Sequence, residues 1–249
     1  MTIRLLISLV LAALPVSASG PETLDVEVTP QEVGIGVFFS GRTVTVSGSA
    51  GSSLDVAVEV FGPAEEGRFH LKGRAGPLWM NLKEVHLGNA PLLYLLLTSD
   101  GVVSEEDLTT MGIGLKHIEN SVEVRPESLD KDMIFDQYLQ LKRSQGLYAE
   151  RQGAVSYGSP DGERRSFRAE FLLPSSATPG TYEIVATGLD GNLSVCNTLL
   201  EFQVVEVGVI KAIRDFAFSY GLMYGIVCVV IALLVGGVMG MFFKRAGAH

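Results

Sequence analysis

Residues Leu222–Phe243 read LMYGIVCVVIALLVGGVMGMFF, a run of twenty-two residues without a charged side chain. A helix rises about 1.5 Å per residue, so a helix of this length covers the roughly 30 Å of hydrocarbon in a bilayer. Two basic residues, Lys244 and Arg245, follow at once. The run predicts a transmembrane helix over 222–243, and the chain before it is expected to be a targeting signal or a region held at one membrane face.

The first eighteen residues have the pattern of a secretory signal peptide. Arg4 supplies the positive charge, Leu5–Leu14 the short apolar core, and Val16-Ser17-Ala18 the small residues of a cleavage site. This core is too short to span a bilayer. With the basic pair beyond the span, the positive-inside rule predicts a single-pass type I topology, an external region and a cytoplasmic tail over 244–249.

The region from Ser19 to Gly221 is strongly acidic. It contains 16 basic and 28 acidic residues, a net charge of −12. Such a surface repels phosphate backbones, so nucleic acid is not expected as a partner. Cationic ligands or basic loops of another protein fit the sign, and so does the simpler interpretation that the charge keeps the region soluble.

Residues 19–101 have the pattern of short β-strands. Apolar and polar residues alternate over Leu24–Val28, Arg42–Ser47 and Leu54–Phe61, as in a sheet with one wet face. Pro91–Thr98, PLLYLLLT, is continuously apolar and predicts a strand buried on both faces. The pattern favours a mainly β fold, an immunoglobulin-like antiparallel sandwich with Trp79 in its core. Turns are expected at Gly48–Ser53, Gly62-Pro63, Gly76-Pro77 and Gly88-Asn89.

Residues 102–150 form a helical insertion in this pattern. Ser104-Glu105-Glu106-Asp107 has the form that starts a helix, which the glycines at 112 and 114 soon weaken. A longer helix is predicted from Leu129 to Gln145, with Gly146 as its stop. Its apolar stripe, expected to pack on a sheet, comprises Met133, Ile134, Tyr138 and Leu141.

Strands return over 151–206. Ser166–Leu173 alternates, and turns are expected at Pro160-Asp161-Gly162 and Asp190-Gly191-Asn192. Four strands are few for an independent sandwich, so they either form a second lobe or pack onto the first, and we favour two lobes. The two cysteines cannot readily pair, because Cys228 lies in the span while Cys196 lies in a strand.

Residues 207–221 predict an amphipathic juxtamembrane helix lying at the membrane interface. The aromatic residues expected there are Phe216, Phe218, Tyr220 and Tyr224. Within the span, Gly236 and Gly240 form a G-x-x-x-G pattern. Such a pattern lets a second helix pack closely, although glycine is also common in membrane helices in general.

The sequence shows no catalytic or metal-binding constellation. The histidines of the external region, His70, His86 and His117, have no metal-ligand spacing, and no C-x-x-C, G-x-S-x-G or phosphate-binding loop is present. No cofactor is therefore expected.

A set of short patterns occurs together along the chain. They are Phe39-Ser40-Gly41, Val60–Pro63, Leu78–Asn81, Leu141–Tyr148, Phe167-Arg168-Ala169, Leu173-Pro174, Pro179–Tyr182, Asp190-Gly191, Val207-Gly208 and Asp215-Phe216-Ala217. Because these patterns occur together, the chain resembles the alphaproteobacterial putative transmembrane protein family from about Leu24 to Phe243. It departs from that family over Ser104–Asn120, which is richer in glycine and acids. The resemblance implies a bacterial protein with a signal peptide, one C-terminal span and no assigned catalytic residue, and an accessory role beside permeases of the sulfite-exporter type.

Three functions are compatible with these features. The first hypothesis is a non-catalytic protein anchored in the bacterial inner membrane, with a periplasmic domain that contacts a transporter or another membrane complex. The alternative is a free-standing periplasmic ligand-binding or sensor module, which an aromatic-lined pocket with polar groups would favour. The third, an anchored enzyme, would require His70, His86 and Glu84 to converge in a cleft.

Overall fold

The computed structural model describes residues 24–75, 77–100, 104–126 and 128–246. The predicted signal peptide lies outside these residues. Strands make up 48% and helices 28% of the residues that the structure describes. The mainly β prediction is therefore confirmed, whereas the immunoglobulin-like assignment stays a prediction.

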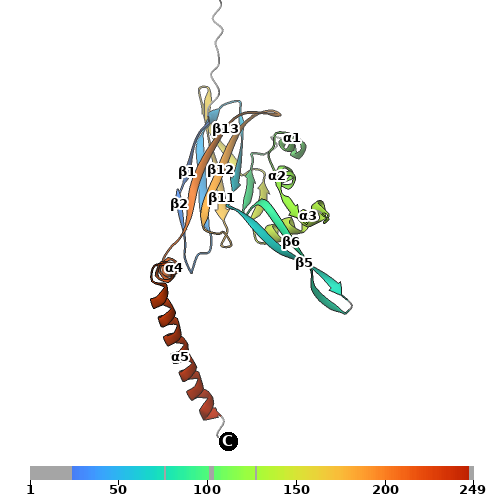
Figure 1. The fold of residues 1–249 in the computed structure, drawn as a ribbon. Coiled ribbons are helices and arrows are strands. Elements are labelled where there is room, and N and C mark those ends of the chain that lie inside the picture. Colours follow the sequence, from blue (N-terminus) through green and yellow to red (C-terminus); the bar gives the residue numbers. More distant parts are fainter. Residues whose placement is uncertain (1–23, 76, 101–103, 127, 247–249) are drawn as a thin grey trace, which may run out of the picture.

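Ten strands form two large sheets (Figure 1). Sheet A is antiparallel, with the order β1 (Asp25–Thr29), β3 (Arg42–Gly51), β11 (Arg164–Leu173), β10 (Val155–Asp161). Sheet B has the order β2 (Glu32–Ile35), β13 (Leu193–Glu206), β12 (Gly180–Asp190), β4 (Asp55–Phe61), β7 (Tyr94–Leu97), β9 (Tyr148–Arg151). In sheet B, β2 runs parallel to β13 and β9 parallel to β7.

The two sheets pack face to face around one core. The ring of Phe171 on β11 lies 6.2 Å from that of Phe202 on β13, and both are buried. At the edge, the Val56 amide of sheet B donates to the hydroxyl of Tyr157 of sheet A at 2.8 Å. Both β regions of the sequence contribute to each sheet, and β3 pairs with β11 along its whole length. The expectation of two lobes is therefore wrong, because the inward faces of early and late strands bury one another.

Strand β7 is buried on both faces, as its continuous apolar sequence predicts. Sheet A covers the inner face. The outer face is covered by three helices, α1 (Glu105–Thr110), α2 (Leu115–Ser121) and α3 (Lys131–Ser144). Ser104 caps α1 as predicted, since its hydroxyl accepts from the Asp107 amide at 3.2 Å.

The predicted long helix is α3, but its buried stripe differs from the prediction. Ile134 and Tyr138 are buried, whereas Met133 and Leu141 are exposed. Phe135 takes part in the core instead, because α3 contacts both sheet B and the β5–β6 hairpin and so buries a wider face.

A third sheet forms an arm beside the sandwich. It consists of the long hairpin β5 (Ala64–Ala75) and β6 (Leu78–Pro91), with β8 (Glu123–Arg125) on β6. The turn expected at Gly88-Asn89 is instead a bulge in β6, where Asn89 has a φ of 59°. Trp79 stands near the tip of the arm opposite Arg74, and its side chain lies outside the described part.

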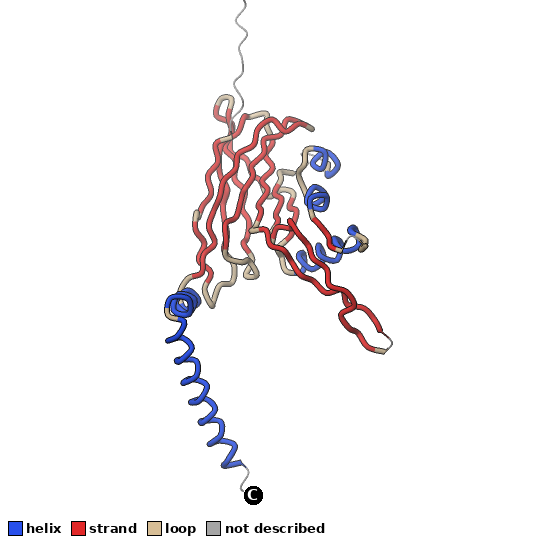
Figure 2. Tube along the Cα trace, in the orientation of Figure 1, coloured by secondary structure: helices blue, strands red, loops and turns tan. Residues whose placement is uncertain are grey.

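Two helices follow the sandwich, α4 (Val209–Ser219) and α5 (Gly221–Ala246). Figure 2 shows α4 almost end-on while α5 runs along the page, so α4 lies crosswise to α5. Residues Gly221–Met241 of α5 are long and apolar enough to cross a membrane, and no other part of the described chain buries them. Both helices begin and end close to where the sequence predicts them.

We expect the sandwich to unfold as one unit. Phe171→Ala removes a ring shared by both sheets and is expected to cost about 3–5 kcal/mol. In urea unfolding of the full chain in detergent, one transition should shift to lower denaturant, with hydrogen exchange rising in 42–51 and in 180–206 together. The matched control is Leu172→Ala, whose side chain is 51% exposed on the same strand and should leave the transition nearly unchanged. Two transitions, only one of them shifted, would contradict the single core.

Candidate functional site

A buried carboxyl group lies on the outer face of sheet B. Glu59 on β4 is only 6% exposed. The Tyr94 hydroxyl donates to its Oε1 at 2.7 Å, and the Gly114 amide donates to the same oxygen at 3.3 Å. Burial raises the pKa of Glu59 above its ordinary value of 4.5, while these two hydrogen bonds and the charge of His117 oppose part of the rise.

Gly114 directly precedes α2, and a second carboxylate contacts the start of this helix. Glu150 on β9 accepts a hydrogen bond from the Leu115 amide at 3.1 Å, in the first turn of α2. The chain reaches this position through Gly112 and Gly114, whose φ angles of 77° and 102° suit glycine. The glycine-rich segment therefore places the start of α2 against two acids of sheet B.

A groove of about 380 Å³ lies between α2 and sheet B. On the helix side it is lined by His117 and Ile118, and on the sheet side by Glu59, Phe61 and Val185. The helices cover only the β4, β7 and β9 half of the outer face. The groove therefore opens toward the other half, formed by β12 and β13.

The outer surface of β12 and β13 beside the groove carries an apolar pair and an acidic pair. Val185 lies opposite Leu199, whose side chain is 60% exposed. Glu183 lies directly opposite Glu201, and both are exposed. Two like charges placed opposite each other destabilise a sheet. We call the surface formed by these four residues the open face.

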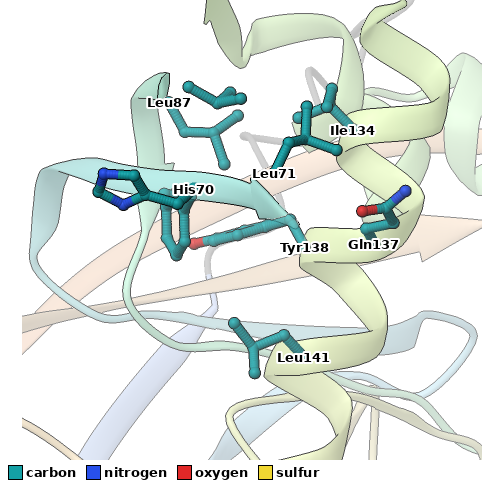
Figure 3. Close-up of a pocket in the computed structure, with 9 residues that line it drawn as sticks. His70, Leu71, Leu87, Ile134, Gln137, Tyr138 and Leu141 are labelled. Carbon is teal, nitrogen blue, oxygen red and sulfur yellow. The ribbon is translucent and has the colours of Figure 1, made fainter. Parts of the chain in front are cut away.

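A smaller cleft of about 160 Å³ lies between the arm and α3 (Figure 3). Leu71 and Leu87 of the arm face Ile134 and Tyr138 of α3 across it. The ring of Phe69 packs edge-on against that of Tyr138 at 5.5 Å. These contacts brace the base of the arm against α3.

The histidines do not gather in one site. His70 lines the arm cleft, while His86 lines a separate hollow with Glu123. His86 lies 3.7 Å from Glu84, and both side chains are about half exposed. Among the residues that the structure describes, no group of three or more His, Cys, Asp or Glu side chains is arranged to hold a metal ion.

The aromatic residues predicted for the interface lie at the junction of α4 and α5. The ring of Phe216 is 6.1 Å from that of Tyr220 and 6.1 Å from that of Tyr224. Phe218 is 87% exposed on α4. No side chain of α4 is buried by the sandwich, so its apolar face is available to lipid.

Two contacts tie α4 to the sandwich. The Arg214 guanidinium lies 2.6 Å from Glu206 Oε1 at the end of β13. The Val207 amide donates to the Ile35 carbonyl at 2.9 Å, which continues the β2–β13 pairing up to the helix. The membrane-proximal segment therefore starts from a fixed point of the fold.

The other predicted residues lie along α5. A Cβ added at Gly236 or Gly240 would meet nothing within 4 Å, so this face of the helix is open. Lys244 and Arg245 lie in the last turns of α5, and their side chains are outside the described part.

Sequence reasoning missed Glu59 and the open face, and it named His117 without placing it in the same groove as Glu59. The alternation in β4 places Glu59 on the face opposite the apolar one. The sequence analysis expected this second face to contact water. The apolar sequence of the neighbouring strand β7 was a usable signal for the burial of Glu59. A strand buried on both faces needs a covering layer on each side, and such a layer also buries side chains of the adjacent strands.

We expect the stability difference between the wild type and Glu59→Gln to depend on pH. Because the folded pKa of Glu59 is raised, its stabilising contribution is greatest below 4.5 and is lost as the pH rises through the folded pKa. Glutamine does not titrate, and its oxygen can still accept from Tyr94 and Gly114. From about pH 4 to about pH 8, the melting temperature of the variant should rise relative to the wild type. A constant difference, or one of opposite slope, would contradict a raised pKa at this position.

We expect Gly236→Ile combined with Gly240→Ile to weaken association of α5 with a partner helix, because branched side chains hold the two backbones apart. Co-purification after mild-detergent extraction measures the association, and resistance to carbonate extraction measures insertion, which should not change. Leu234→Ile with Val238→Ile, on the opposite face, is the control. Unchanged co-purification of the glycine variant would remove this motif from the interface.

A comparison with curated proteins finds no match to this chain. The model of the family described as "Putative transmembrane protein (Alph_Pro_TM)" matches residues 23–245. The match covers the sandwich, the arm, α4 and nearly all of α5, which is the extent expected from the sequence patterns. The chain therefore belongs to the Alph_Pro_TM family of transmembrane proteins.

Proposed function

We propose that the protein is a non-catalytic, membrane-anchored contact protein whose β domain lies in the periplasm and whose α5 crosses the bacterial inner membrane. The domain works as an accessory to a transporter or another membrane complex. The observation that carries this proposal is the open face with its adjoining groove, held at a fixed position relative to the membrane-spanning helix.

The open face has the composition of a contact surface. Leu199 and Val185 offer an apolar centre, and the groove beside them adds the aromatic side chain of Phe61. Apolar side chains left exposed next to a groove are typical of sites that bind another protein.

The acidic pair indicates the charge of the partner. Glu183 and Glu201 repel each other in the isolated domain, and among the described residues neither takes part in an ion pair. A basic side chain brought by a partner would relieve this repulsion. We therefore propose a partner segment that combines apolar and basic residues.

The anchoring of α4 supports a partner within the membrane. The ion pair of Arg214 with Glu206 and the backbone bond from Val207 to Ile35 connect the membrane-proximal helix directly to β13 and β2. The open face lies on β12 and on the same strand β13. Its place on the strand that leads into the anchor supports a partner that resides in the same bilayer.

The family resemblance and α5 together favour one class of partner. The resemblance implies an accessory role beside permeases of the sulfite-exporter type. The exposed face around Gly236 and Gly240 offers a second place where a helix of such a permease can pack.

The alternative function, a ligand-binding or sensor module, is favoured by the volume of the groove. Sites for small molecules usually measure about 300–1,000 Å³. The groove of about 380 Å³ falls in this range, whereas the arm cleft of about 160 Å³ does not. Enzymes also contain buried carboxyl groups with a raised pKa. Oε1 of Glu59, however, already accepts hydrogen bonds from Tyr94 and Gly114, which suits a structural role.

Site-specific photo-crosslinking in native membranes tests the contact function. A photoreactive amino acid at position 199 should form an adduct with one defined membrane protein. The same group at position 172, on sheet A and 51% exposed, is the matched control and should not. Equal adducts at both positions, or none at 199, would contradict the proposal. If a small cationic molecule then raises the melting temperature, the sensor alternative is favoured.

The acidic pair gives a second measurement on the same contact. Glu183→Gln with Glu201→Gln removes a repulsion, so stability should stay equal or rise by about 0.2–1 kcal/mol. The adduct at position 199 should nevertheless fall by roughly two- to ten-fold, as expected for two rim charges. If the double variant is stabilised and the amount of adduct at position 199 does not fall, the partner does not interact with these two charges.

A further inference from the structure

We propose that the tip of the β5–β6 arm is a second membrane contact, which inserts the side chains of Leu78 and Met80 into the interfacial layer of the leaflet nearest the sandwich. Basic residues along the arm then contact anionic lipid headgroups. The sandwich would stand on the membrane at two separated points, the α4–α5 junction and the arm tip.

The position of the arm supports this contact. Figure 1 shows that the arm leaves the sandwich on the side toward which α5 runs, and that its tip lies at about the level where α5 begins. Membrane helices tilt by about 20° on average, so a bilayer placed around α5 can also meet the tip. The opposite hairpin turn, between β12 and β13, lies at the far end of the sandwich.

The tip itself is apolar. Leu78 is 69% exposed and Met80 is 52% exposed. Single exposed apolar residues are normal on protein surfaces, and Leu193 at the β12–β13 turn is 70% exposed as well. Exposure alone therefore does not distinguish a turn that inserts into the membrane from an ordinary surface turn. The charge around each turn does distinguish them.

The outer part of the arm, from Gly67 to Lys83, differs in charge from the rest of the external region. It contains four basic residues, Arg68, Lys72, Arg74 and Lys83, and no acidic residue, whereas Glu65, Glu66 and Glu84 of the same hairpin lie farther from the tip. The remainder of Ser19–Gly221 contains 12 basic and 28 acidic residues. A basic stem with an apolar end is the pattern of segments that bind anionic membrane surfaces. Around Leu193, in contrast, the turn contains Asp190.

The base of the arm is held rigidly enough to fix the position of the tip. Phe69 contacts Tyr138, and Val85 and Leu87 are buried against α3. Strand β8 adds pairing with Leu87 and its neighbours. The direction of the arm is therefore set by the same core that holds the sandwich together.

The full chain contains one tryptophan, Trp79, between the two tip residues, so its fluorescence reports on this contact. The protein is reconstituted into vesicles of phosphatidylcholine and phosphatidylglycerol, with or without acyl-chain-brominated lipid. We expect a blue-shifted emission that brominated lipid quenches. Either orientation in the vesicle is suitable, because the arm and the sandwich lie on the same side of the bilayer.

Variants decide between insertion and nonspecific adsorption. Leu78→Asp with Met80→Asp should lose both the blue shift and the quenching, while Leu193→Asp, matched in exposure, should keep them. In Trp79→Phe with Leu193→Trp, the relocated tryptophan should show no quenching. Circular dichroism checks that each variant is folded, and an Asp variant that fails this check is replaced by Leu78→Ser with Met80→Ser.

The charge of the arm is tested with Arg74→Glu combined with Lys83→Glu. Quenching should decrease in vesicles containing phosphatidylglycerol and stay unchanged in pure phosphatidylcholine, and added salt should reduce the difference. Unquenched Trp79 in the wild type, or equal quenching at position 193, would overturn the proposal. An unquenched tip that crosslinks to a protein in native membranes would also overturn it. The adduct at position 199 is measured separately, so this contact and the proposed function can fail independently.

Discussion

The burial of β7 on both faces is the constraint on which the rest of the fold depends. Its four residues are all apolar or aromatic and all buried, so sheet B needs a cover on each side. Sheet A supplies the inner cover, and the segment 104–144 supplies the outer one as three helices. The cover is completed by aromatic contacts that run from Tyr94 through Tyr148 to Tyr138, with ring distances of 6.1 and 5.7 Å. Without a strand of this kind, the helical insertion would have no surface to bind.

The cover is limited in extent, and this limit creates the surface to which we assign function. The helices end over β4, because Glu59 on β4 and Glu150 on β9 hold the start of α2 against this half of sheet B. Strands β12 and β13 alternate in polarity and need no second cover. Their outer side therefore stays available for contact. The same β13 leads through Glu206 and Val207 into α4, so one strand joins the contact surface to the membrane anchor.

Some predictions were wrong for reasons that the structure makes clear. Two lobes were expected because the late strands are few, but strands far apart in sequence complete one another's sheets. The pairing of Glu183 with Glu201 depends on a register shift between Gly188 and Leu189. With the register of the turn alone, Glu183 would lie opposite Leu200, so the acidic pair cannot be obtained by counting out from the turn.

The sequence by itself determined the membrane-spanning helix, the crosswise helix before it, the strand-rich character and the extent of the family match. These features depend on periodicity and on runs of similar residues, which are short-range properties of the chain. The tertiary structure alone decided which strands pair, that Glu59 is buried while Glu183 is not, and that the arm points toward the side of α5. Each of these depends on contacts between residues many tens of positions apart. A carboxylate in an alternating strand looks the same in sequence whether water or a helix covers it, and only the packing of α2 distinguishes the two.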